Sequence, residues 1–422
     1  MAFPLHRPCG LQPPAIASDA SSIVPPCEQT STWASLALEA ANRFGTPCYL
    51  SRWLPVEQTV ESLERCFAHT IAIRSWLSYK THPVPQLARE WIRSGRGVEV
   101  VSEAEFASIQ GLRCPRGQLL VNGVAKHAWL HRHSVPGLRV HFDSIAEVLA
   151  LRSLARSHAW HVGLRCHLPH EHDRRDSRFG GQFGMTSDEI LFARTELDAV
   201  GIGVEGLHFH LGQGARSEHA YSDSLGYITR LCERGDLAPL YLDCGGGIDA
   251  ASDVAAAAAD LATAIVGMRR GLPSVREVWL ENGRYLTRRS AVLILRVLDS
   301  KERPESRYLI CDGGRTNQAL DADNGPHPVA IIPDRTGRSV LTTIAGPTCM
   351  TDDRLARLML PDSVATGDLI VWFNAGAYHL PWETRFSHGL CTVIWGDAND
   401  RLSLARKRET PEQWSDLWTV NN

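Results

Sequence analysis

The fold is indicated most clearly by the segment Leu240-Tyr241-Leu242-Asp243-Cys244-Gly245-Gly246-Gly247. Its short apolar run ends in a polar residue and glycines, as a buried strand does where it enters a loop. The alanine-rich segment 253–268 follows, and Arg269-Arg270-Gly271 closes it with a typical signal for a helix C-terminus. A second apolar run covers residues 277–281. The segment and the residues after it therefore predict a strand–helix–strand unit. The same alternation of strands and helices extends back toward the N-terminus.

Eight β-leaning runs of this kind precede residue 285, with helix-like segments between them and another, over 56–69, before the first run. The runs are Ile71–Lys80, Gly97–Ser102, Leu119–Gly123, Leu138–Asp143, His161–His167, Val204–Leu211, Leu240–Cys244 and Glu277–Glu281. Eight strand–helix units over about 240 residues predict a (β/α)8 barrel, with a doubly wound sheet as the alternative.

Polar residues lie at or near the C-terminal ends of seven of these runs: Lys80, Ser102, Asn122, Asp143, His210, Asp243 and Glu281. Strand ends are often polar simply because they meet water. In a barrel, however, these ends converge on one mouth, where active sites lie. Their common position therefore predicts a site at that mouth.

The alternation of strands and helices ends after Arg289, where apolar strand-like runs follow one another without helices between them. These runs are Ala291–Leu298, Arg307–Cys311, His327–Pro333, Ser339–Ile344, Asp368–Phe373, Cys391–Asp397 and Leu402–Arg408. This pattern is typical of a β-sandwich or β-barrel domain. We therefore expect a loose arm over 1–32, a barrel domain over 33–288 and a β domain over 289–422. The helix predicted over 33–44 is a candidate to pack on the β domain.

Composition limits the class of protein. The 422 residues contain 44 Lys+Arg and 47 Asp+Glu, a net charge of −3, whereas nucleic-acid-binding domains normally show a basic excess. No apolar run approaches the ~20 residues that cross a bilayer, and the proline-rich start does not resemble a signal peptide. We therefore expect a cytoplasmic protein that binds neither nucleic acid nor membrane. The 11 cysteines include no CxxC pair, which argues against a disulfide framework or a zinc site.

Lys80 lies in Ser78-Tyr79-Lys80-Thr81-His82-Pro83, at the end of the first barrel run. A lysine amine held at a barrel mouth can form a Schiff base with a carbonyl compound or with pyridoxal phosphate (PLP). The alternative is a solvated surface charge, the usual state of a lysine. Lys80 is therefore a candidate for Schiff-base formation, and the residues around it decide between this role and a surface charge.

Two glycine-bearing loops follow the last two barrel runs. The N–H groups of Gly245–Gly247 can form an anion-binding nest, and Gly283 and Arg284 follow Glu281. The loops after strands seven and eight of such barrels commonly bind phosphate. An inward carboxylate at Glu281 would keep a pyridine nitrogen protonated, because an opposite charge favours the charged form. The alternatives are a flexible turn for the glycines and a local ion pair between Glu281 and Arg284.

Two further groups are candidates for chemistry. His208 and His210 share one face of their strand, but no third ligand has metal-site spacing. Stacking on a planar cofactor is therefore the favoured interpretation, and no metal is predicted. In the β domain, Cys349 follows the turn-like Gly346-Pro347. Its thiol is either an exposed acid or another buried small side chain.

In this order, the motifs resemble those of the fold-type III PLP-dependent decarboxylases, the family of ornithine, arginine and diaminopimelate decarboxylases. The resemblance runs from about Phe44 to Tyr378 and implies a (β/α)8 barrel followed by a C-terminal β domain. The motifs are Gly45–Tyr49, Ser78–Pro83, Gly97–Ser102 with Glu105, Phe183–Met185, His210–Gly212, Gly245–Gly247, Glu281–Arg284, Gly346–Asp353 and Gly376–Tyr378.

The resemblance implies a role for each matching residue. Lys80 would hold PLP covalently, His210 would stack on its ring, Glu281 would pair with the ring nitrogen, and Arg165 would support the cofactor from below. Residues around the phosphate would be Gly245, Gly246, Gly247, Gly283, Arg284 and Tyr378. Cys349, which would protonate the α carbon after CO2 loss, and Asp353 would come from the partner subunit of a homodimer with shared sites.

Departures from the family pattern bear on the substrate. Met350 stands where relatives that grip a distal amine place Asp or Glu, and a thioether cannot pair with an ammonium. Gln213 replaces a serine, and the segment 312–328, with Asp321 and Asp323, lacks the tyrosine-containing pattern of the polyamine enzymes. The sequence looks closer to natural-product and siderophore-pathway members. Some of those members take modified or carrier-protein-tethered amino acids. We therefore expect an amino acid or amino-acid derivative other than ornithine, lysine, arginine or diaminopimelate, either free or tethered to a carrier protein.

Two other functions stay open. A PLP-dependent racemase or epimerase could use a similar barrel, although Cys349 in a decarboxylase-type motif argues against it. A non-catalytic regulator descended from the family would be expected to have lost Lys80, Glu281 or Cys349, and the sequence retains all three.

Overall fold

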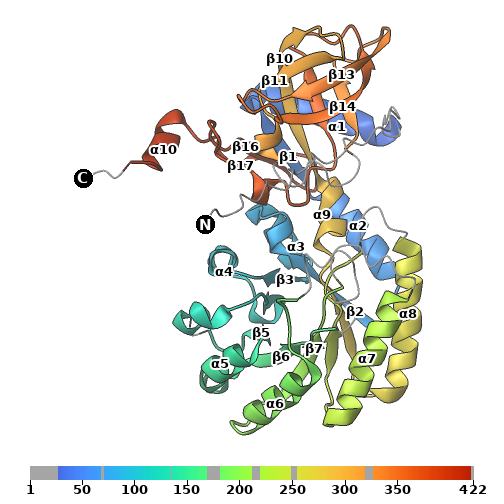
Figure 1. Cartoon of the computed structure of the whole chain (residues 1–422), viewed down its shortest axis with the longest axis vertical. Helices are drawn as coiled ribbons and strands as arrows, with labels where there is room; N and C mark the ends of the chain where they lie inside the picture. The colour runs from blue at the N-terminus through green and yellow to red at the C-terminus, as the bar shows by residue number, and fades with distance from the viewer. Residues whose placement is uncertain are drawn as a thin grey trace, which may run out of the picture.

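A computed structural model describes residues 27–67, 71–133, 135–168, 181–211, 219–248, 254–318 and 327–419. A barrel surrounded by helices and a separate sheet domain lie one above the other along the long axis (Figure 1). Residues 1–26 of the expected arm lie outside the described residues, as do Gly212, Gln213, Asp321 and Asp323. Residues 27–32 are the first turns of helix α1 (Cys27–Phe44).

Eight parallel strands form a closed barrel in chain order. They are β2 (Ala72–Ser78), β3 (Gly97–Val100), β4 (Leu119–Val121), β5 (Arg139–Phe142), β6 (His161–Arg165), β7 (Val204–His208), β8 (Tyr241–Asp243) and β9 (Glu277–Leu280). Strand β9 pairs with β2 and closes the barrel. Each strand lies within one predicted run, so the barrel predicted from the strand rhythm is confirmed.

Helices connect the strands around the outside of the barrel (Figure 1). They are α2 (Leu54–Arg65), α3 (Pro85–Arg93), α4 (Glu103–Gly111), α5 (Ile145–Ser157), α6 (Ser187–Asp198), α7 (Ala220–Gly235) and α8 (Val254–Gly271). Ser102, Ser144 and Thr186 cap α4, α5 and α6, each accepting the backbone N–H three residues later. Caps of this kind stabilise a helix by about 1 kcal/mol each. They fix where each helix starts after the strand that carries site residues.

Aromatic side chains fill the barrel below the mouth. The rings of Tyr241 and Trp279 stack with centroids 3.5 Å apart, and Trp76 packs against Trp279 at 4.9 Å. Gly206 makes room for them, because a Cβ there would lie 2.1 Å from the Tyr241 ring. The lower barrel is therefore a packed core, and the site residues lie above it.

A nine-stranded sheet forms the second domain and confirms the predicted β domain. Its strands are β1 (Cys48–Arg52), β10 (Ala291–Lys301), β11 (Arg307–Cys311), β12 (Val329–Ile332), β13 (Ser339–Ala345), β14 (Arg354–Pro361), β15 (Leu369–Trp372), β16 (Thr392–Gly396) and β17 (Leu402–Arg406). Strand β14, which the sequence analysis did not predict, pairs antiparallel with β13.

Helix α1 packs on this sheet, as proposed for residues 33–44, and strand β1 is part of the sheet although the predicted barrel range 33–288 includes it. Strand β1 lies between β10 and β16. Trp33 and Leu36 of α1 join Leu50 of β1 in one buried apolar cluster with side chains of β10 and β15. From Cys27 onward, the described chain therefore runs first through the sheet domain, then through the barrel and back into the sheet domain. Among the described helices, none is long and apolar enough to cross a membrane.

The two domains meet next to Lys80. The N–H of Tyr378 donates to the carbonyl oxygen of Thr81 at 2.7 Å. Ser51 Oγ of β1 lies 2.8 Å from Nε2 of the fully buried His82. The loop that carries Lys80 is thus fixed by contacts from the sheet domain.

Acid is expected to destabilise this junction. Burial lowers the pKa of His82 to about 4, whereas an unfolded histidine titrates near 6.5. Between these values the unfolded chain binds more protons, so the His82 contribution is complete above pH 6.5 and is lost as the pH falls toward 4. The loss is roughly 3 kcal/mol in the free energy of unfolding. Urea titrations from pH 7 to 4 measure it. Because other buried histidines titrate in the same range, His82→Gln should make the pH dependence shallower without removing it, and an unchanged slope would contradict the assignment.

Candidate active site

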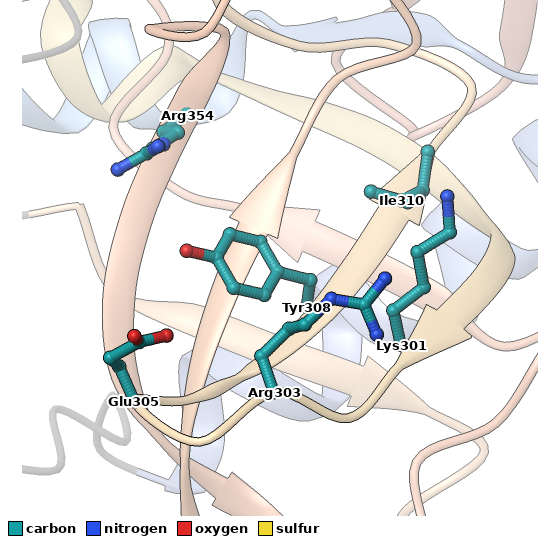
Figure 2. A pocket seen from close by; sticks show the side chains of 6 residues that line it. All are labelled: Lys301, Arg303, Glu305, Tyr308, Ile310 and Arg354. Carbon is teal, nitrogen blue, oxygen red and sulfur yellow. The ribbon is translucent and has the colours of Figure 1, made fainter.

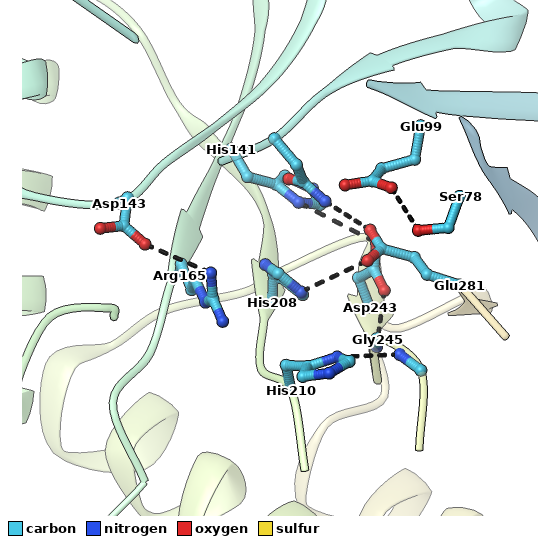
Figure 3. A network of polar contacts seen from close by, with 12 residues as sticks. Ser78, Glu99, His141, Asp143, Arg165, His208, His210, Asp243, Gly245 and Glu281 are labelled. Carbon is cyan, nitrogen blue, oxygen red and sulfur yellow. Dashed lines mark hydrogen bonds and ion pairs between the residues drawn. The ribbon is translucent and has the colours of Figure 1, made fainter. Parts of the chain in front are cut away.

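Lys80 lies at the mouth of the barrel, in the short 3-10 turn Tyr79–Thr81 after β2. Its Nζ donates to Glu99 Oε2 and to Ser78 Oγ, both at 2.7 Å. Ser78 Oγ donates in turn to Glu99 Oε2 at 2.5 Å (Figure 3). The Glu99 side chain on β3 is 1% exposed and that of Lys80 is 36% exposed. A buried carboxylate therefore holds the amine while the Lys80 side chain stays accessible.

The surrounding charges keep the Lys80 amine protonated. Burial opposes the charge, but the carboxylates of Glu99 and Glu281 outweigh it and raise the pKa of Lys80 above its ordinary value. An amine must lose its proton before it attacks a carbonyl carbon. Glu99, in direct contact with Nζ, is the group placed to take that proton.

The other lysines are poor alternatives for holding a cofactor. The sequence has four: Lys80, Lys126, Lys301 and Lys407. Lys126 is fully buried in an ion pair with Glu147, with Nζ 2.7 Å from Oε2. Lys301 is in β10 and Lys407 follows β17, both in the sheet domain. Lys80 is thus the accessible lysine of the barrel.

Glu281 directly follows β9 and is also buried. Asn122 Nδ2 donates to its Oε1 at 2.5 Å. His208 Nε2 lies 3.8 Å from its Oε2 (Figure 3). Burial, followed by the charges of Asp243 and Glu99, raises the pKa of Glu281 well above its ordinary value. A cationic group beside this carboxyl would favour its ionised form.

His210 lies just after β7, and its imidazole is neutral with a fixed ring proton. Its Nδ1 accepts the N–H of Gly246 at 3.0 Å, so the ring proton is on Nε2. Burial, with the charge of Arg165, lowers the pKa of His210 to about 3. A neutral imidazole held in this way can lie against a planar aromatic group.

The two glycine loops leave space that side chains would fill. Gly245 and Gly247 have φ of +62° and +131°. A Cβ at Gly246 would lie 2.9 Å from the carbonyl oxygen of Glu281. Gly283 begins α9 (Gly283–Thr287), where a Cβ would lie 2.3 Å from a Thr81 side-chain carbon. Glycine therefore lets these backbones approach each other and the Lys80 turn.

Arginine side chains complete the mouth. The Arg284 guanidinium lies 4.7 Å from the centroid of the Tyr378 ring, which comes from the sheet domain. Tyr378 adopts φ of +62° where it contacts Thr81. Arg165 ends β6, with Nη1 3.5 Å from Asp143 Oδ1. The structure therefore brings Arg284, Tyr378 and Arg165 to the same region as Lys80.

Comparison with known proteins identifies this arrangement. Residues 56–288 match the family model of the pyridoxal-dependent decarboxylases for the pyridoxal binding domain, and residues 219–376 match the model for the C-terminal sheet domain. The first match alone covers more than half of the chain. The chain belongs to the pyridoxal-dependent decarboxylases. It is a PLP-dependent carboxy-lyase that acts on an amino acid, which disfavours both the non-catalytic regulator and the racemase alternative.

Several relatives of this decarboxylase match it over nearly its whole length. Diaminopimelate decarboxylase of Deinococcus radiodurans is 27% identical over 392 residues, covering 90% of this chain and 97% of the relative. L-glutamyl-(BtrI acyl-carrier protein) decarboxylase of Niallia circulans is 26% identical over 376 residues, covering 81% and 86%. Diaminopimelate decarboxylase of M. jannaschii, solved with L-lysine, has the same fold, with a TM-score of 0.78 at 21% identity over 91% and 94% of the two chains.

The described side chains of the decarboxylase fit PLP. Both ring nitrogens of buried His208, Nδ1 of buried His141 and Oδ2 of Asp243 have no hydrogen-bond partner among the described residues. The glycines leave space for a phosphate beside the Lys80 turn, while the N–H groups of Gly245, Gly246 and Gly283 donate to Asp243, His210 and Glu281. Glu281 supplies a carboxyl for the ring nitrogen, and Lys80 supplies the amine. The site thus offers room for the anionic phosphate near the glycines and a carboxyl for the cationic ring at Glu281.

Cys349, Met350 and Asp353 lie in the loop between β13 and β14 of the sheet domain, and Cys349 is exposed. The resemblance implied that Asp353, like Cys349, would reach the site of a partner subunit. In the structure this residue is buried, and its Oδ1 accepts the N–H of Arg315 while its Oδ2 accepts the Thr348 hydroxyl, both at 2.6 Å. Both carboxylate oxygens are therefore engaged in shaping the loop that carries Cys349.

A hollow of about 350 Å³ on the sheet domain is distinct from this site (Figure 2). It is lined by Lys301, Arg303, Glu305, Tyr308, Ile310 and Arg354. It contains none of the residues predicted for the active site.

Sequence reasoning did not assign roles to three residues that the structure brings to the centre of the site. Glu99 contacts Lys80, Asn122 contacts Glu281, and Asp243 lies next to Glu281. Asn122 and Asp243 were recognised only as polar strand ends. The available signal for Glu99 was a charged residue inside an apolar strand run, which in a barrel predicts an inward side chain with a buried partner.

Proposed function

We propose that this decarboxylase binds PLP through Lys80 and that Cys349 of a partner subunit protonates the α carbon of the substrate after CO2 leaves. The observation that carries the proposal is the accessible Lys80 amine, held by buried Glu99 at a mouth that also contains Glu281, His210 and the glycine loops. Together they provide an amine to bind the cofactor, a carboxyl for its ring nitrogen, an imidazole for its ring face and space for its phosphate.

PLP supplies an aromatic ring that accepts the electron pair left when CO2 departs. Glu281 would pair with the ring nitrogen, and His210 would cover one face of the ring. Gly245, Gly246, Gly247, Gly283, Arg284 and Tyr378 would surround the phosphate, and Arg165 would support the cofactor from its side of the barrel. Glu99 would accept the proton that Lys80 must lose.

We further propose a homodimer with shared sites. Cys349 is exposed on the sheet domain, as expected for a thiol that reaches the site of another copy. Helix α10 (Pro411–Asp416) stands away from both domains in Figure 1. Leu417 and Trp418, which follow it, are 53% and 68% exposed. Exposed large apolar side chains of this kind are typical of an interface.

The proposed substrate is an amino acid whose distal group is not a free cation, modified or tethered to a carrier protein, from a specialised biosynthetic pathway. Met350, next to Cys349, supports this choice because its thioether cannot pair with an ammonium group. A relative named for an acyl-carrier-protein substrate is about as similar to this chain as several diaminopimelate decarboxylases.

A substrate panel tests the proposal. PLP-loaded protein is incubated with free amino acids, diaminopimelate included, and with aminoacyl carrier proteins. Released CO2 and product masses are then measured. The proposal expects CO2 and an amine from a non-cationic substrate. An inverted amino acid that keeps its carboxylate would indicate a racemase instead, and preferential turnover of diaminopimelate would refute the substrate assignment.

Met350→Asp is expected to shift selectivity toward cationic substrates. A carboxylate at this position can pair with a distal ammonium, and such a charge-assisted bond corresponds to roughly a tenfold gain in kcat/KM for lysine or diaminopimelate. Met350→Leu, which preserves size and apolarity, is the matched control and should leave selectivity unchanged. Identical selectivity in the two variants would remove Met350 from the substrate pocket.

A further inference from the structure

Two buried carboxyl groups face each other at the centre of the barrel mouth. Asp243 ends β8 and Glu281 follows the neighbouring strand β9, and their side chains are 0% and 5% exposed. Carboxyl oxygens of Asp243 and Glu281 and a ring nitrogen of His141 all lie within 4.8 Å of one another (Figure 3). Two carboxylates this close and this buried cannot both carry a full negative charge without a compensating cation.

One oxygen of each carboxyl is already hydrogen-bonded. Asp243 Oδ1 accepts the N–H of Gly245 at 2.8 Å, and Glu281 Oε1 accepts from Asn122. The remaining oxygens face histidines, with Asp243 Oδ2 3.9 Å from His141 Nδ1 and Glu281 Oε2 3.8 Å from His208 Nε2. Each carboxyl thus has one oxygen fixed by the protein and one directed into the site.

The neighbouring charges do not neutralise the pair. On β5 and β7, burial lowers the pKa of His141 to about 3 and that of His208 well below its ordinary value, so both rings are neutral. His210 is neutral for the same reason. Lys80 is paired with Glu99, and Arg165 contacts Asp143. Burial also raises the pKa of Asp243 to about 7. Without a cofactor, the pair therefore keeps one proton.

We propose that Asp243 is a positioning residue that acts through Glu281: the two carboxyls share one proton while the cofactor is absent and transfer it to the ring nitrogen when PLP binds. This inference rests on the proposed function, in which Glu281 pairs with that nitrogen. The proton leaves a carboxyl oxygen and forms an N–H bond on the ring. The two carboxylates and the ring cation then carry the same net charge as the protonated pair, so no proton has to enter from solvent.

Asp243→Asn removes one of these charges while preserving shape. The lost negative charge lowers the proton affinity of the ring nitrogen, so the nitrogen should lose its proton at a pH at least one unit lower than in the wild type. Nitrogen NMR of protein loaded with ring-¹⁵N PLP measures this midpoint directly. Tyr241→Phe is the matched control, because it removes the hydroxyl 2.9 Å from His141 Nε2 in the same cluster without changing charge, and its midpoint should equal that of the wild type. A wild-type midpoint in Asp243→Asn would overturn the proposal.

A measurement on the unaltered protein does not depend on how the variant folds. Infrared difference spectra between the apo and PLP-loaded wild type should show the loss of a protonated carboxyl C=O band on loading. PLP binding with no such loss would overturn the inference and leave the proposed function intact. A protein that does not bind PLP through Lys80 would instead refute the proposed function itself.

Discussion

Lys80→Ala is expected to release CO2 at least roughly 10³-fold more slowly than the wild type, the scale of losing a covalent catalytic group. The visible absorbance of PLP bound through a lysine should disappear as well. The physical reason is that the described barrel has no second accessible lysine, since Lys126 is fully buried with Glu147. Spectra and CO2 release measured on the same samples check both losses.

Lys301→Ala is the matched control for that experiment. Lys301 lies in β10 of the sheet domain, and its side chain is 48% exposed. Its loss should leave absorbance and rate unchanged. A Lys80→Ala protein that kept both the absorbance and the CO2 release of the wild type would contradict the assignment of Lys80.

Mixing two inactive variants is expected to restore activity. Cys349→Ala should bind PLP normally but decarboxylate roughly 10²-fold more slowly, as expected when a general acid is lost. If Cys349 serves the partner's Lys80, a mixed dimer of Cys349→Ala and Lys80→Ala contains one intact site. Random exchange would make half of the dimers mixed, so activity should recover to about a quarter of the wild-type value. Rates measured over a range of mixing ratios test this result.

The control pairs two variants within the barrel, Lys80→Ala and Glu281→Gln. Both residues serve the site of their own chain, so no mixed dimer contains an intact site and no activity should return. Exchange of subunits is verified with two affinity tags. Proven exchange with no recovery in the Cys349 mixture would show that Cys349 does not complete the partner's site.

Much of the fold could be predicted from the sequence because barrel strands are local signals. Each is a short apolar run, and several end in a polar residue, such as Asp243 after Tyr241 and Leu242. Strand β14 was missed because Arg354 and Arg357 interrupt its apolar pattern, and its pairing with β13 supplies what the pattern lacks. Strand β1 shows the same limit: its place between β10 and β16 depends on partners more than 200 residues away.

The site, too, contains residues that could be predicted from the sequence and contacts that could not. Lys80, Glu281 and the glycine loops were predicted because their residue types match a chemistry at the ends of strands. Contacts across the barrel were not predictable, because they depend on which inward side chains meet. Glu99 lies 19 residues from Lys80, and Asn122 lies 159 residues from Glu281. The placement of Asp353 was also beyond the sequence, since a buried carboxylate that shapes a loop and one that contacts a substrate are the same residue type.

Peptide mapping after borohydride reduction shows which lysine carries the cofactor, and we expect it to be Lys80. Reduction fixes PLP on its lysine, and trypsin no longer cleaves at a modified lysine. If PLP is on Lys80, trypsin should release a single peptide of residues 75–89 that carries one phosphopyridoxyl group, in place of the separate peptides 75–80 and 81–89. A phosphopyridoxyl group on Lys126, Lys301 or Lys407, or on no lysine after loading with PLP, would refute the assignment of Lys80.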